Sequence, residues 1–119
     1  MIPIYTSRGD LGAFLVYPHL FNIQGDWIGW VTQEREVYSV LGYYVGYLTN
    51  DPRILRKRVI EETKPKRIPP THPEHIQPMA TVPLARLMSE LSHDTIDILM
   101  EEPDNLHTMD MGELREDID

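Results

Sequence analysis

The residues best suited to metal or acid–base chemistry are five scattered histidines: His19, His72, His75, His93 and His107. The run His72-Pro-Glu-His75 places two imidazoles and a carboxylate close together, which is a conceivable metal pair. Its spacing matches no zinc signature, and Pro73 prevents the helical geometry that would aim both rings at one ion. We therefore expect no metal site.

No catalytic motif accompanies these histidines. The chain has no G-x-S-x-G elbow, no glycine-rich phosphate loop and no Walker lysine. The absence of cysteine excludes thiolate nucleophiles, thiolate zinc sites and disulfides. Paired carboxylates occur in residues 101–119, where we expect solvation to keep them from any catalytic role. We expect a protein that is not an enzyme, with no catalytic residue and no cofactor.

Aromatic residues offer a binding surface of a different kind. All ten lie between Tyr5 and Tyr47. On a half-exposed sheet, one aromatic face could stack a sugar, a base or a proline-rich peptide. The alternative is that both faces are buried, one by the curl of the sheet and one by a C-terminal helix, and aromatic stripes are more often core. The candidate ligand-binding residues are Trp27, Trp30, Tyr43, Tyr44 and Tyr47.

Basic residues gather in one segment, 53–67, which holds seven of the eleven. This pattern suggests an anion-binding stripe, or alternatively a charged edge strand followed by a solvated connector. The net charge of −8 opposes nucleic acid and favours the alternative. Residues 101–119, with eight acids against Arg115, could fold over the stripe and screen it. The candidate anion-binding residues are Arg53, Arg56, Lys57, Arg58, Lys64, Lys66 and Arg67.

A sequence repeated three times carries the aromatic residues. Each copy reads aromatic, three residues, Gly, three residues, Gly or Ala, aromatic, aliphatic, over residues 5–15, 21–31 and 38–48. One copy predicts one β-hairpin, with Gly9, Gly25 or Gly42 at the positive φ of a tight turn. The small residue at position 13, 29 or 46 lies inside the second strand. There we expect an aromatic ring of the neighbouring repeat to pack closely over it.

This motif resembles the small bacterial domains called four-fold β-flower proteins, which are built from repeated short hairpins around a pseudo-symmetry axis. The resemblance covers residues 3–50. A four-fold flower implies a fourth unit, and residues 53–60 have strand character but lack the turn glycine and the aromatics. The family carries no established activity, so the resemblance implies no catalytic residue.

The second half of the chain has a different composition. Six of the ten prolines lie between Pro65 and Pro83, which predicts an extended, polyproline-like segment. Leu84, Leu87, Met88 and Leu91 then follow i, i+3, i+4, i+7 spacing, which predicts an amphipathic helix beginning at Pro83.

The predicted fold is mainly β. It is an antiparallel meander of three repeated hairpins with six strands, or seven with residues 53–60, curled or barrel-like, because an open edge would invite aggregation. A proline-rich extended segment and a short C-terminal helical segment follow it. The predicted boundaries are 1–60 for the hairpin domain, 61–82 for the basic proline-rich segment, 83–101 for the helical segment and 102–119 for an acidic, disordered tail.

A small core with a long appendage favours a structural or protein-interaction module that oligomerises through the proline-rich segment and the helix. The expected partner is a second copy or another protein. The alternatives are a ligand-binding module that uses the aromatic face, and an anion-binding module that uses residues 53–67. No apolar run approaches 18 residues and the first ten residues lack signal-peptide features, so we expect a cytoplasmic protein that binds no membrane.

Overall fold

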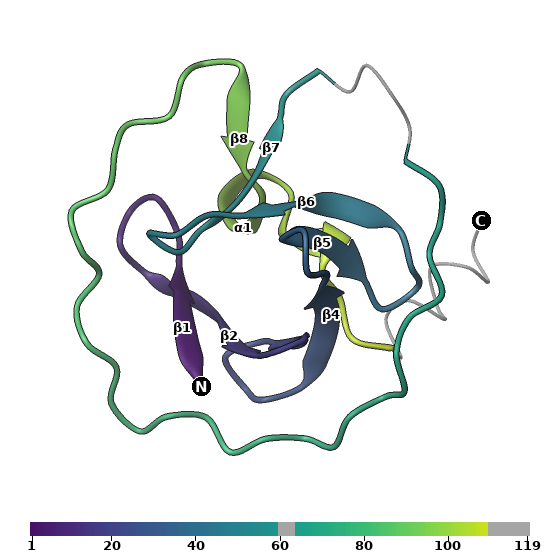
Figure 1. Cartoon of the computed structure of the whole chain (residues 1–119). Coiled ribbons are helices and arrows are strands. Elements are labelled where there is room, and N and C mark those ends of the chain that lie inside the picture. The colour runs from purple at the N-terminus through teal and green to yellow at the C-terminus, as the bar shows by residue number, and fades with distance from the viewer. Residues whose placement is uncertain (60–63, 110–119) are drawn as a thin grey trace.

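The computed structural model describes residues 1–59 and 64–109, and in them eight strands form one antiparallel sheet. Each strand pairs with the next along the chain, and the sheet curls into a half-barrel (Figure 1). The strands are β1 (Ile2–Tyr5), β2 (Leu11–Val16), β3 (His19–Phe21), β4 (Trp27–Val31), β5 (Glu36–Ser39), β6 (Tyr44–Leu48), β7 (Ile54–Lys57) and β8 (Thr95–Asp97). The predicted mainly β meander is confirmed, and β8 is a strand that the sequence analysis missed.

The three predicted hairpins are β1–β2, β3–β4 and β5–β6. Their turns contain Gly9, Gly25 and Gly42, with φ of 88°, 92° and 91°, the left-handed region that glycine adopts without a Cβ clash. The first side chain of each turn accepts the backbone N–H of the fifth residue, as Asn22 Oδ1 does from Asp26 N at 2.9 Å. Local side-chain hydrogen bonding therefore specifies these turns.

The turn at 32–36, at the other end of β5, has the same hydrogen bonds with a different residue at the glycine position. Thr32 Oγ1 accepts the N–H of Glu36 at 3.1 Å, and Arg35 adopts φ 66°. A non-glycine residue in this region is uncommon and costs roughly 1–2 kcal/mol. The arginine side chain compensates by donating to Leu48 O at 3.0 Å and to Thr49 O at 2.9 Å.

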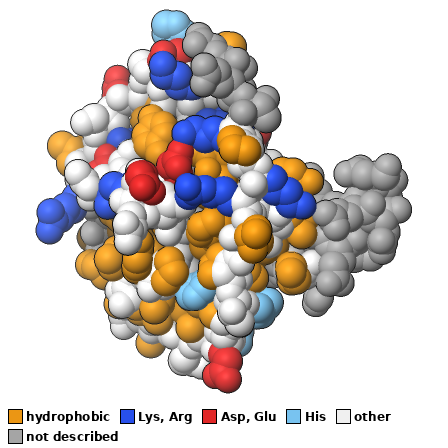
Figure 2. Space-filling view, turned by 45° about the vertical axis from the view of Figure 1, so that its right-hand side comes forward, with side chains coloured by type: hydrophobic (Ala, Val, Ile, Leu, Met, Phe, Trp, Pro, Cys, Tyr) orange, Lys and Arg blue, Asp and Glu red, His pale blue; other side chains and the backbone are white. Residues whose placement is uncertain are grey.

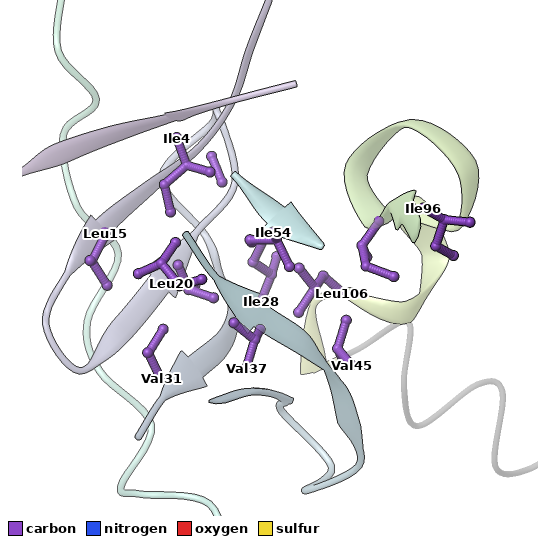
Figure 3. Packing of buried hydrophobic residues seen from close by; sticks show 13 residues of the cluster. Ile4, Leu15, Leu20, Ile28, Val31, Val37, Val45, Ile54, Ile96 and Leu106 are labelled. Atoms are coloured by element: carbon purple, nitrogen blue, oxygen red, sulfur yellow. The ribbon is translucent and has the colours of Figure 1, made fainter. Parts of the chain in front are cut away.

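The interior of the half-barrel is aliphatic. Figure 3 shows Leu106 beside Ile54 and Val45 in this cluster. The large aromatic side chains Phe14, Phe21 and Trp27 form a second cluster on the outer face instead. The inner cluster consists of Ile4, Ala13, Leu15, Leu20, Ile28, Val31, Val37, Val45, Leu48, Ile54, Ile96, Ile98 and Leu106.

Close packing over the strand glycines comes from backbone, which corrects the predicted aromatic contact. A Cβ at Gly29 would lie 2.5 Å from the carbonyl oxygen of Tyr38 on β5, and one at Gly46 would lie 2.3 Å from that of Leu55 on β7. The neighbouring strand approaches so closely that only glycine fits at these positions.

Residues 64–91 form an extended segment that runs around the outside of the strands (Figure 1), and we call it the arm. The predicted helical segment over 83–101 is wrong for 83–97: residues 83–94 contain no helix, Thr95–Asp97 form β8, and α1 spans only Ile98–Glu101. Leu84 and Leu87 are 95% and 102% exposed, while Ala85 and Met88 are partly buried. Burial at every third residue fits a polyproline-type extended chain, which has three residues per turn.

The arm contacts the three glycine turns in succession. Arg67 N donates to Gly42 O at 2.9 Å, and Ile76 N donates to Gly25 O at 3.0 Å. Ala85 Cβ lies 3.8 Å from the position that a Cβ on Gly9 would occupy. The contacting arm residues are nine positions apart, so the docking of the arm follows the hairpin repeat.

The C-terminal segment packs against the inner cluster of the half-barrel. Asp97 caps α1 by accepting the N–H of Leu99, the 3-10 helix η1 spans Pro103–Asn105, and Leu106 is buried in the inner cluster. The predicted disordered tail is therefore wrong for residues 102–109. The rest of that prediction, 110–119, lies outside the described residues.

A buried polar network joins the first hairpin to β8. Asp97 Oδ2 accepts from both N and Oγ of Ser7 at 2.7 Å. Ser7 Oγ also accepts from Arg53, which pairs with Asp51 at 2.6 Å. Arg53 and Asp97 are 4% and 2% exposed, so their charges are satisfied by these partners. Among the described residues, no helix has the length and apolar character to cross a membrane.

Candidate functional site

A cavity of about 450 Å³, which we call cavity A, lies between the β5–β6 hairpin and the C-terminal segment. It combines aromatic, charged and amide side chains, the types that bind a polar ligand. The lining residues are Ser39, Leu41, Tyr43, Tyr44, Val45, Arg56, Glu102, Asp104, Asn105 and His107.

Tyr43 and Tyr44 reach cavity A because they end the glycine turn and begin β6. Tyr43 is 53% exposed, and the Lys66 ammonium lies 5.0 Å from its ring centroid. Lys64 lies at the same distance from the ring of Tyr44. Burial raises the pKa of the Tyr44 hydroxyl and the Lys64 charge offsets part of that rise, so the phenol is a neutral donor at neutral pH.

Arg56 on β7 forms a two-pronged ion pair with Glu102, which follows α1. Its Nη2 lies 2.6 Å from Glu102 Oε2 and its Nη1 lies 3.3 Å from Oε1. Asn105 Nδ2 donates to Glu102 Oε1 at 3.0 Å. The hydrogen bond from Arg56 lowers the pKa of Glu102 although burial opposes it, so Glu102 is a carboxylate.

This arrangement selects against charged ligands. An anion in cavity A would meet the carboxylates of Glu102 and Asp104, and a cation would meet the guanidinium of Arg56. A neutral molecule with several hydroxyl groups can instead hydrogen-bond to charged and amide groups that already hold each other in place.

The five predicted aromatic residues do not form one platform. Trp27 is 4% exposed, and its ring packs edge-on against His19 and against His72 of the arm. Trp30 stacks on Tyr38 at 5.0 Å and donates its Nε1–H to Ser39 O at 3.1 Å. Tyr47, on β6, is 36% exposed and does not line cavity A. Tyr43 and Tyr44 are the two that meet.

The basic residues of the predicted stripe do not form one continuous surface, because most of them pair with different partners. Figure 2 shows Lys and Arg side chains close to Asp and Glu side chains on one face. Arg53 is buried and Lys57 is exposed. Arg58 pairs with Glu101 at 3.3 Å. The remaining members are Arg56 with Glu102, Lys64 with Glu36, Lys66 over Tyr43 and Arg67 over Tyr38.

The two histidines of the arm contact different groups. His72 packs on Trp27 with ring centroids 4.9 Å apart, and His75 Nδ1 lies 2.9 Å from Asp26 Oδ1. In residues 1–59 and 64–109, no group of three or more His, Asp or Glu side chains could hold a metal ion.

Sequence reasoning missed most of the polar side of cavity A. Glu102, Asn105 and His107 lie in the segment for which the acidic composition predicts a disordered tail, and their low hydrophobicity provides no signal for a site. Leu106 was the available signal, because a leucine in an acidic segment indicates a residue that can pack against a core.

The comparisons with known proteins provide no relative. No protein-family model, no curated protein and no solved structure matches the chain.

Proposed function

We propose that the protein is a ligand-binding β module that takes a small neutral sugar in cavity A. The observation that supports this proposal is that half-exposed Tyr43 and the Arg56–Glu102 ion pair line the same cavity. Its volume of about 450 Å³ falls in the range of small-molecule sites.

Each part of the site has a role in this proposal. The ring of Tyr43 offers an apolar face to the C–H side of a sugar. The Glu102 carboxylate accepts hydrogen bonds from sugar hydroxyl groups, and Asn105 supplies both an acceptor and a donor. The ion pair with Arg56 holds the Glu102 carboxylate in place before the ligand arrives, which reduces the entropy lost on binding.

The test is an NMR titration with a panel of neutral monosaccharides. We expect shifts of backbone amides in residues 39–45 and 102–107, and weaker binding in Tyr43→Ala and Asn105→Ala. Tyr17→Ala is the matched control because Tyr17 is 59% exposed and lies outside cavity A. An absence of shifts with every sugar, or an equal effect of Tyr17→Ala, would contradict the proposal.

Oligomerisation through the proline-rich segment and helix stays a prediction. Backbone atoms of the arm bind Gly25 and Gly42 of the same chain, while Ile68, Leu84 and Leu87 are at least 91% exposed. Large apolar side chains on the surface favour an interface. Light scattering after size exclusion tests the prediction, and a monomer at all concentrations would contradict it.

A further inference from the structure

A second cavity, of about 550 Å³, lies at the other end of the half-barrel from cavity A, and we call it cavity B. Cavity A adjoins the turn at 39–43, whereas cavity B adjoins the turns at 32–36 and 49–53. The two turns 32–36 and 39–43 flank β5, so the cavities are separated by the length of that strand.

Cavity B is lined mainly by apolar side chains. Tyr5, Leu15 and Leu48 are 5%, 7% and 6% exposed, and they belong to the sheet. Leu84, in contrast, is 95% exposed and belongs to the arm. The hydroxyl of Tyr5 donates to Pro83 O, which fixes this part of the arm as one wall. A hydrocarbon ligand could bury against these side chains and cover part of Leu84.

Two guanidinium groups line the same cavity. Arg35 uses Nε and Nη2 on the carbonyl oxygens of Leu48 and Thr49, which are neutral acceptors and leave its charge uncompensated. Arg86, from the arm, makes no hydrogen bond or ion pair with any residue that the structure describes. The nearby carboxylate of Asp51 is already paired with Arg53 at 2.6 Å.

The net charge of the side chains that line cavity B is therefore positive, although the net charge of the whole chain is −8. Asp51 does not cancel it, because the Asp51 carboxylate is neutralised by its own ion pair with Arg53. Burial raises the pKa of Asp51, but hydrogen bonds from Arg53 and Thr49 outweigh that effect and lower the pKa. The guanidinium group of Arg35 is held in one orientation, because it donates hydrogen bonds to two backbone carbonyl oxygens.

We propose that cavity B binds a small apolar carboxylic acid. The hydrocarbon part lies against Leu15 and Leu48, and the carboxylate bridges Arg35 and Arg86. Guanidinium groups suit this role because their planar donors match the two oxygens of a carboxylate. This site is independent of the neutral-sugar site, since it shares no lining residue with cavity A.

Calorimetry with octanoate, below its micellar concentration, tests the proposal with 1-octanol as the neutral analogue. We expect octanoate to bind at least about tenfold more tightly than octanol, because a charge-assisted hydrogen bond contributes about 1.5–3 kcal/mol. Arg35→Gly and Arg86→Gln should each weaken octanoate binding by a similar factor while leaving octanol binding unchanged.

The variants have matched controls. Arg35→Gly keeps the turn, because glycine occupies the same position in three other turns. Arg8→Gln removes one charge from an exposed residue that does not line cavity B, and it should leave octanoate binding unchanged.

The calorimetry would overturn the proposal if octanoate and octanol bound with equal affinity, if Arg8→Gln weakened octanoate binding as much as the other two variants, or if octanoate gave no heat. NMR shifts induced by octanoate at residues 39–45 rather than at 48–52 would also overturn it, because they would assign the ligand to cavity A. The sugar titration of cavity A is unaffected by any of these results.

Discussion

Ile76 in the arm donates its backbone N–H to the carbonyl oxygen of Gly25 in a hairpin turn, at 3.0 Å. A Cβ on Gly25 would lie 2.0 Å from the carbonyl oxygen of Ile76, so the two backbones are in direct contact. Arg67 and Gly42 repeat both contacts with the same 2.0 Å approach. The turn glycine therefore serves two purposes, a positive φ and a docking surface for the arm.

Substituting alanine for individual turn glycines should distinguish the energetic cost of a positive φ from the cost of displacing the arm. Gly9→Ala should lower the free energy of unfolding by roughly 1–2 kcal/mol, from the cost of φ 88° alone, because Ala85 is at an ordinary contact distance. Gly25→Ala should cost more, since it must also displace the arm. Urea denaturation measures both, and equal losses would show that the arm contributes no contact energy at Gly25.

The buried network around Arg53 should be a large contributor to stability. Arg53→Met leaves Asp51 and Ser7 without their donor. Because the Asp51 side chain is 29% exposed, we expect a loss of about 1–3 kcal/mol, the typical cost of an acceptor left unpaired. The control Lys57→Met removes an exposed charge and should change the free energy of unfolding by less than about 0.5 kcal/mol. Similar denaturation midpoints for the two variants would contradict the prediction.

His19 should make the fold less stable below neutral pH. Burial, and next the charge of His72, lower the pKa of His19 from its ordinary 6.5 in the folded protein. The unfolded chain therefore binds this proton first, and the contribution of His19 is full above pH 6.5 and is lost as the pH falls from 6.5 towards the folded pKa.

An NMR titration of the histidine rings measures this effect directly. The midpoint of His19 should lie below 6.5, and His72→Gln should raise it because one opposing charge is removed. His93→Gln is the control, since His93 is exposed and is not among the causes of the shift. A midpoint at or above 6.5 in the wild-type protein would contradict the prediction.

The acidic residues after β8 should screen the basic segment. Glu101 and Glu102 pair with Arg58 and Arg56, so the double variant Glu101→Gln/Glu102→Gln releases two guanidinium groups. We expect stronger retention on heparin at low salt, and the gain should vanish as salt screens the charges.

The control for this experiment changes the net charge equally at another place. Glu74→Gln/Glu90→Gln removes two exposed carboxylates of the arm that are not the ion-pair partners of Arg56 and Arg58. Equal retention of both double variants across the salt gradient would show that net charge alone governs heparin binding.

The arm shows why a sequence pattern can be misread. Leu84, Leu87, Met88 and Leu91 satisfy the spacing of a helix, yet Leu84 and Leu87 face solvent. An extended chain with three residues per turn partly buries Val82, Ala85, Met88 and Leu91 instead. The 3.6-residue period of a helix and the three-residue period of an extended chain differ little over eight residues. The surface that the segment packs against therefore determines which of the two conformations it adopts.

The sequence by itself determined the local units: the three hairpins, their turn glycines and the seventh strand. These depend on residues within about five positions of each other, because turn geometry and side-chain hydrogen bonds are short-range. Only the tertiary structure decided the pairing of β7 with β8, the path of the arm and the two cavities. Tyr43 and Glu102 both line cavity A, and Arg35 and Arg86 both line cavity B, although each pair is too far apart along the chain for local preferences to bring it together. Such contacts depend on how the whole sheet curls and on which surface remains for the arm and the C-terminal segment to cover.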